Sequence, residues 1–120
     1  MVRICLAVCA LTLATAATAV AAGTPFDGAW SVSVITNSGT CDRGYRYALR
    51  IDNGVVSYDD PSFNVSGHVA ANGQVTVSVS NGGSRASGTG RLSRDSGGGM
   101  WSGHSSMQGC SGHWEAERRG

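Results

Sequence analysis

The sequence predicts an all-β protein, an eight-stranded antiparallel up-and-down barrel in which each strand pairs with its neighbours along the chain. Three observations lead to this prediction. Apolar and polar residues alternate with a period of two in one segment after another, as they do in half-buried strands. None of these segments has the apolar periodicity of a helix. Short Gly and Asn clusters separate them, and such clusters form tight turns between antiparallel strands.

Each expected strand has one apolar face. In chain order the strands are expected at residues 29–36, 45–52, 55–58, 63–69, 74–80, 85–92, 100–107 and 110–118. Their apolar or small faces begin, in the same order, with Trp30, Tyr45, Val56, Phe63, Val75, Ala86, Trp101 and Cys110. The intervening residues are mostly Ser, Thr, Arg, Asn and His, so the opposite face is expected to meet solvent.

The turns fix which residues lie opposite one another, because loop length sets the register of a hairpin. A two-residue turn at 53–54, a three-residue loop at 71–73 with Gly73 in a bulge, and a turn at 81–84 all match apolar with apolar or small positions. They predict the pairs Ile51–Val56, Leu49–Tyr58, Val69–Val75, Gly67–Val77 and Val79–Ala86.

The last two turns are expected at the Gly-rich loop 97–99 and at 108–109. They predict the pairs Leu92–Trp101, Gly90–Gly103, Met107–Cys110 and Gly103–Trp114.

Residues 1–22 have the features of a cleaved signal peptide, namely Arg3, an apolar run and a small-residue end at 20–22. Its removal leaves residues 23–120 as a single domain in the periplasm or outside the cell. Of nine basic residues one is Arg3, so eight Arg then balance eight Asp and Glu. This balance argues against a nucleic-acid or membrane-surface partner for what we expect to be a monomer.

Two cysteines, Cys41 and Cys110, remain after this cleavage, and in an oxidising compartment they are expected to form a disulfide. Cys41 follows the first strand and Cys110 begins the eighth. In a closed barrel these two strands are neighbours, so the disulfide favours closure. An open two-sheet β-sandwich is the alternative.

The inward positions include five glycines and six aromatic rings. The glycines are Gly67, Gly88, Gly90, Gly103 and Gly112, and they give room to neighbouring rings. We expect side chains to fill the interior, leaving at most a shallow pocket at one mouth. The rings expected to close a barrel end or to contact a ligand are Trp30, Trp101, Trp114, Tyr45 and Tyr47.

The three histidines all occur in the tripeptide Ser-Gly-His, with the His facing outward. His68 is on a distant strand. A turn at 108–109 would place His104 opposite His113, with Cβ atoms about 5 Å apart. With Glu115 diagonal to His104, these three residues are a candidate zinc or copper site. The alternative is a pair of ordinary solvent-facing histidines.

No catalytic motif occurs in the chain: the sequence has no G-x-S-x-G elbow and no H-E-x-x-H pair. We therefore expect a protein that is not an enzyme and has no cofactor.

The stretch FDGAWSVSV at 26–34, with CDRGYRYALRIDNGVVSY and GCSGHWEAERR, resembles a group of small secreted bacterial domains that begin with Phe-Asp-Gly-x-Trp. The segment Gly28-Ala29-Trp30 also resembles the first strand of lipocalin-like barrels. That resemblance implies that Trp30 plugs one end while Arg118 or Arg119 packs over it. A third resemblance is to small periplasmic metalloprotease-inhibitor barrels of about this length with one disulfide.

Together these observations favour a secreted or periplasmic, non-enzymatic β-barrel module that binds a small ligand or a protein partner. A protease-inhibitor-like barrel is one alternative. A metal-binding surface site at His104 and His113 is the other.

Overall fold

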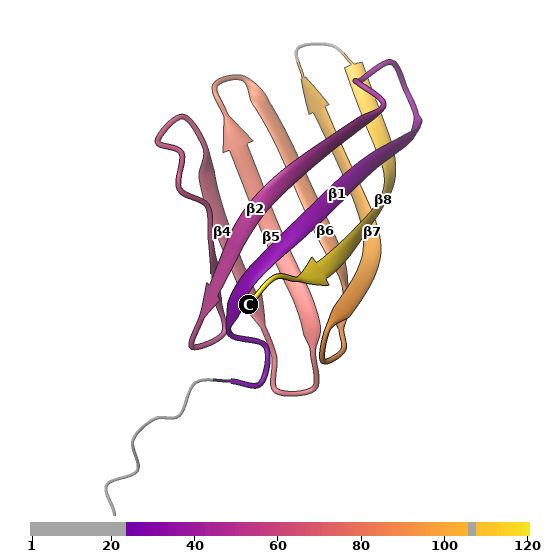
Figure 1. Ribbon diagram of the computed structural model, residues 1–120. Coiled ribbons are helices and arrows are strands. Elements are labelled where there is room, and N and C mark those ends of the chain that lie inside the picture. Colours follow the sequence, from indigo (N-terminus) through magenta and orange to yellow (C-terminus); the bar gives the residue numbers. More distant parts are fainter. Residues whose placement is uncertain (1–23, 106–107) are drawn as a thin grey trace, which may run out of the picture.

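The computed structural model of the protein describes residues 24–105 and 108–120, which form a closed antiparallel barrel (Figure 1). The strands are β1 Gly28–Ser38, β2 Gly44–Asp52, β3 Val55–Ser57, β4 Asn64–Val69, β5 Gln74–Asn81, β6 Ser84–Leu92, β7 Ser96–Ser105 and β8 Gln108–Arg118. Each strand pairs with its neighbours in sequence, and β8 returns to pair with β1. The predicted barrel is confirmed, and the sandwich is not formed. The predicted signal peptide, residues 1–22, lies outside the described residues.

The barrel closes where β1 meets β8, and a disulfide reinforces this seam at one end. Cys41 and Cys110 are joined as predicted, with Cα atoms 6.1 Å apart and a separation of 69 residues in sequence. The backbone amide of Cys41 also lies 3.1 Å from the Cys110 sulfur. A cross-link over a loop of this length is worth about 4 kcal/mol in the chain-entropy model.

The first hairpins have the predicted registers. Ile51 pairs with Val56, Val69 with Val75, Gly67 with Val77 and Val79 with Ala86. Asn53 and Gly54 both have positive φ, at 53° and 79°, as a two-residue hairpin turn requires. The predicted Leu49–Tyr58 pair is wrong, because β3 ends at Ser57 and its ladder with β2 stops at Arg50.

The predicted register between β6 and β7 is wrong by four residues along β7. Leu92 pairs with Gly97 and Gly90 with Gly99, so Gly97, Gly98 and Gly99 belong to the strand and form no loop. The turn is tighter and lies at 93–96, where the backbone amide of Ser93 donates to the Ser96 carbonyl at 2.7 Å.

The physical reason for this register is the indole of Trp114. A Cβ on Gly90 would lie 2.5 Å from Cζ2 of that ring, and one on Gly99 would lie 2.6 Å from the Cα of Gly90. Gly90, Gly99 and Trp114 form one row across three strands, since Gly99 pairs with both of the others. The missing side chain of Gly90 therefore provides the space that the Trp114 ring fills, while Gly99 lets β7 approach the backbone of β6 closely in the same row.

The predicted register between β7 and β8 is wrong by the same amount. Gly103 pairs with Cys110 and Trp114 with Gly99. The predicted Met107–Cys110 pair includes Met107, which lies outside the described residues, but Cys110 has Gly103 as its partner.

The row of Gly90, Gly99 and Trp114 can be tested by adding a single methyl group. Gly90→Ala should destabilise the protein by about 1–3 kcal/mol, because the new Cβ overlaps the Trp114 ring. Gly83→Ala is the matched control, since a Cβ there meets nothing within 4 Å. Urea unfolding measures both. An equal effect of the two substitutions would contradict the register.

Candidate functional site

The interior of the barrel contains a cavity of about 640 Å³ to which all eight strands contribute lining residues. The expectation of a filled interior was therefore wrong. The reason lies in the inward positions of β6 and β7 that line the cavity, where Ala86, Gly88 and Gly103 have little or no side chain. The rings on the other strands do not reach far enough to fill the space these residues leave.

The two ends of the cavity differ in polarity. The inner end is lined by buried apolar side chains, namely Trp30, Ile51, Val56, Val69, Val75, Leu92 and Ala116. The outer end is lined by polar side chains, including Thr36, Thr40, Asp42, Ser80, Asn81, Ser84, Ser105 and Gln108. We call these ends the base and the mouth. A molecule bound inside would meet hydrocarbon and aromatic surface at the base and hydrogen-bonding groups at the mouth.

Two tryptophans of the cavity wall are fixed by hydrogen bonds to backbone carbonyls. The indole N–H of Trp101 donates to Ile35 at 2.9 Å, and that of Trp114 donates to Thr89 at 3.1 Å. Because both polar atoms already have partners, the parts of these rings that line the cavity act as apolar surface.

Four further rings gather on the side of the cavity near the mouth. Tyr47 lies edge-on to Tyr58 at 5.6 Å and to Phe63 at 6.3 Å, and Tyr58 lies edge-on to Phe63 at 5.4 Å. Tyr45 is tilted against Tyr47 at 5.9 Å. All four line the cavity. We call Tyr45, Tyr47, Tyr58 and Phe63 the aromatic cluster.

Two tyrosines of the cluster, Tyr45 and Tyr47, have a raised pKa. Burial, and to a smaller extent the neighbouring Tyr58, raises the pKa of Tyr47. The hydroxyl of Tyr45 donates to the Asp42 carboxylate, and this bond raises the pKa of Tyr45. Tyr45 and Tyr47 therefore add no charge to the cavity wall at neutral pH.

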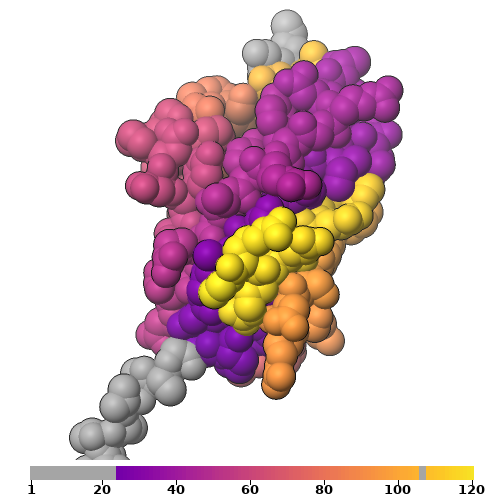
Figure 2. All heavy atoms as spheres, in the orientation of Figure 1, coloured from indigo at the N-terminus to yellow at the C-terminus, as the bar shows by residue number. Residues whose placement is uncertain are grey.

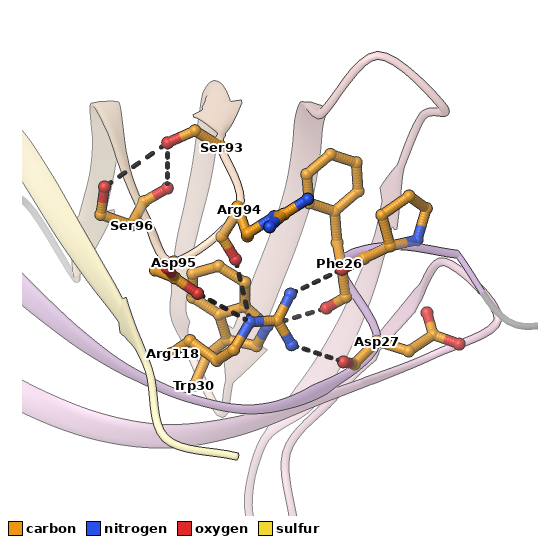
Figure 3. A network of polar contacts seen from close by, with 9 residues as sticks. Phe26, Asp27, Trp30, Ser93, Arg94, Asp95, Ser96 and Arg118 are labelled. Carbon is orange, nitrogen blue, oxygen red and sulfur yellow. Dashed lines mark hydrogen bonds and ion pairs between the residues drawn. The ribbon is translucent and has the colours of Figure 1, made fainter.

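The base of the cavity is closed by Trp30, which is 2% exposed, and Arg118 lies over its ring at 4.8 Å (Figure 3). The guanidinium also donates to the carbonyls of Asp27 at 2.7 Å, Pro25 at 2.6 Å and Arg94 at 2.9 Å. The packing expected for Arg118 or Arg119 is thus made by Arg118. Figure 2 shows the C-terminal residues lying against the N-terminal residues at this end.

The carboxylate of Asp27 ties the base to the turn between β2 and β3. It accepts hydrogen bonds from the Thr24 hydroxyl at 2.6 Å and from the backbone amides of Asn53 at 2.7 Å and Gly54 at 3.1 Å. The Thr24 bond is the largest of the effects that lower the pKa of Asp27, and burial opposes it in part.

The predicted metal geometry is not formed, because the register separates its two histidines. His104 lies opposite Gly109, while His113 lies opposite Met100. The histidines are thus about 13 Å apart along the strands, four residues at roughly 3.3 Å each. His113 instead contacts Asn37 at 2.8 Å and Glu115 at 3.5 Å. Within residues 24–105 and 108–120, no three His, Cys, Asp or Glu residues are placed to hold a metal ion.

The structure brings together all five aromatic residues that the sequence marked as ligand candidates, since each of them lines the cavity. Tyr58 and Phe63 complete the cluster and were not among those candidates. Their inward position in the alternating pattern was the available signal.

The comparisons with known proteins assign no family: no family model matches the chain, and searches of curated proteins and of solved structures found no match. In the described part of the chain there is no helix long and apolar enough to cross a membrane.

Replacing Arg118 tests the closure of the base. Arg118→Met should lower the free energy of unfolding by about 2–4 kcal/mol, because it removes charged hydrogen bonds and the contact with Trp30. Arg119→Met is the matched control and should cost about 0–1 kcal/mol, since Arg119 makes an exposed ion pair with Glu117. Urea denaturation compares them, and equal losses would contradict the role of Arg118.

Replacing Asp27 tests the second contact of the base. The folded-state pKa lies below the ordinary value, so the ionised carboxylate stabilises the fold above about pH 4, and this contribution is lost as the pH falls through the lowered pKa. Asp27→Asn should therefore lower the melting temperature at pH 7, and the difference from the wild type should narrow below pH 4. The exposed Asp59→Asn is the control and should show no such difference at either pH.

Proposed function

We propose that the protein is a secreted or periplasmic, non-enzymatic barrel that binds a small, largely apolar molecule in its cavity. The observation that carries the proposal is an apolar and aromatic cavity, closed at the base and polar at the mouth. Its volume of about 640 Å³ lies within the range of small-molecule sites, about 300–1,000 Å³.

The lining suggests how the molecule lies. An apolar body is favoured at the base, where burial of hydrocarbon surface contributes about 25 cal/mol per Å². A hydroxyl, amide or similar group is favoured at the mouth, where Thr40, Asn81 and Gln108 line the cavity. The ligand we propose is therefore apolar over most of its length, with a polar group at one end.

Binding without a reaction fits the lining of the base. The seven side chains that line it include no acid, base or nucleophile. The disulfide suits an oxidising compartment, which is why we propose secretion or the periplasm. Residues 24–27 contact Arg118 and the β2–β3 turn. We therefore propose that this N-terminal segment closes the base of the barrel and does not inhibit a protease.

Titration with the apolar fluorophore N-phenyl-1-naphthylamine tests the proposal. The purified protein should bind it saturably at one site, with a dissociation constant in the micromolar range. Val77→Trp places a large ring in the cavity and should weaken binding by about tenfold or more, since the ring occupies the volume the probe needs.

Ser78→Trp is the matched control, because Ser78 is the next residue on β5 and its side chain is exposed outside the barrel. It should leave the affinity unchanged. Failure of the wild type to bind, or equal affinities of the two Trp variants, would count against an interior site. Thermal unfolding of each variant verifies that it is folded.

A further inference from the structure

The wall of the barrel is incomplete between β2 and β4 near the mouth. Residues 44–51 of β2 pair with β1. On its other edge, β2 pairs with β3 only through its last three residues, from Arg50 to Asp52. β3 in turn pairs with β4 only at Val55 and Val56. In the part of the chain that the structure describes, the stretch 44–49 has no strand on its other edge.

The width of this gap in the wall can be inferred from the spacing of β2, β3 and β4 at the base. At the base, β3 lies between β2 and β4, so these two strands are two inter-strand spacings apart, about 9.6 Å. Above Ser57 the chain leaves the ladder, and the position beside residues 44–49 has no paired strand. We call this position the slot. In Figure 1 the upper part of β5 is visible between β4 and β2.

The slot is filled by side chains of the aromatic cluster. Tyr47 comes from β2, while Tyr58 and Phe63 come from the two ends of the segment that joins β3 to β4. These three rings contact one another edge to face at 5.4–6.3 Å. Elsewhere the wall is a ladder of paired strands, but here it consists of three ring contacts. Each contact is worth about 0.5–1.5 kcal/mol, about as much as one backbone hydrogen bond, whereas a continued strand would add one such bond at nearly every residue.

The segment between these rings is held mainly by its own turn. The Phe63 amide donates to the Asp60 carbonyl at 3.0 Å, and the Asp60 carboxylate accepts from the backbone amide and the hydroxyl of Ser62. Among the described residues, no hydrogen bond joins 58–63 to β2. The segment can therefore move as a unit once the ring contacts separate, without breaking a backbone ladder.

The rings also lie between the cavity and the outside. Tyr47, Tyr58 and Phe63 line the cavity and are half-buried, and Tyr45 beside them is 48% exposed. A ligand that passes through the slot meets these apolar faces, whereas a ligand that passes the mouth meets the polar side chains of Thr40, Asn81 and Gln108.

We propose that the slot is a lateral passage into the cavity, and that Tyr47, Tyr58 and Phe63 are its gate. This inference rests on the proposed function and narrows its ligand class. A passage one strand wide admits flat ring systems or extended hydrocarbon chains and excludes bulky cages of the same apolar area. The gate therefore selects the ligand by its thickness, while the cavity selects it by its polarity.

Stopped-flow fluorescence with N-phenyl-1-naphthylamine, a flat probe, tests the passage. Phe63→Ala should raise both the association and the dissociation rate by about tenfold, because it removes both edge-to-face contacts of that ring. The dissociation constant should change far less than either rate. Phe63→Leu keeps the residue apolar and should also raise both rates. It can replace the alanine variant if that variant is unstable.

The matched control blocks the other route. Ser84 lines the mouth at the start of β6, so Ser84→Trp narrows the mouth, and it should lower both rates by no more than about twofold if the ligand enters through the slot. If Ser84→Trp slows binding about tenfold and neither Phe63 variant alters the rates, the ligand uses the mouth and the proposal is overturned. If the wild type binds no probe, the proposed function itself fails, and the passage with it.

Discussion

The contact of Arg118 with Trp30 is the interaction on which the rest of the structure depends. Trp30 is on β1 and Arg118 is on β8, so the contact spans the seam where the barrel closes. The same guanidinium binds the carbonyls of residues 25, 27 and 94, which joins the N-terminal segment and the β6–β7 turn to the base. Arg118 thus covers the buried ring of Trp30, which closes the cavity at this end.

The cavity above this base results from an uneven distribution of side-chain size. The inward faces of β6 and β7 have mainly glycine and alanine, while those of β1, β2 and β8 have Trp and Tyr. One indole, that of Trp114, packs directly on this glycine surface. The other rings remain on their own side, and the space between them is the binding volume we propose.

The sequence predicted the first registers because local turn chemistry decides them, and it predicted the disulfide because two cysteines remain after the expected cleavage. Asn53 and Gly54 can adopt a two-residue turn, and each apolar face then meets another. The prediction of the β6–β7 register was wrong because several turns were locally possible there. Gly97, Gly98 and Gly99 resemble a loop, but in the barrel they belong to β7, where a Cβ on Gly97 or Gly99 would lie within 2.6 Å of a backbone oxygen of β6.

The sequence predicted the rings that line the cavity but not the cavity itself. The alternation placed Trp101 and Tyr47 inward, but it could not show whether opposite walls touch, since this depends on the sizes of residues on all strands. The predicted His104–His113 pair was wrong because it depended on the predicted register of β7 and β8. The observed register differs by four residues, which separates the two histidines by about 13 Å along the strands.

A crystal structure of the protein under xenon pressure tests the central claim, an open apolar interior, most directly. Xenon binds in apolar cavities that water does not fill. We expect a xenon site inside the barrel, between Val77 and the ring of Trp30 at the base. An interior filled by side chains, with xenon bound only on the outer surface, would contradict it.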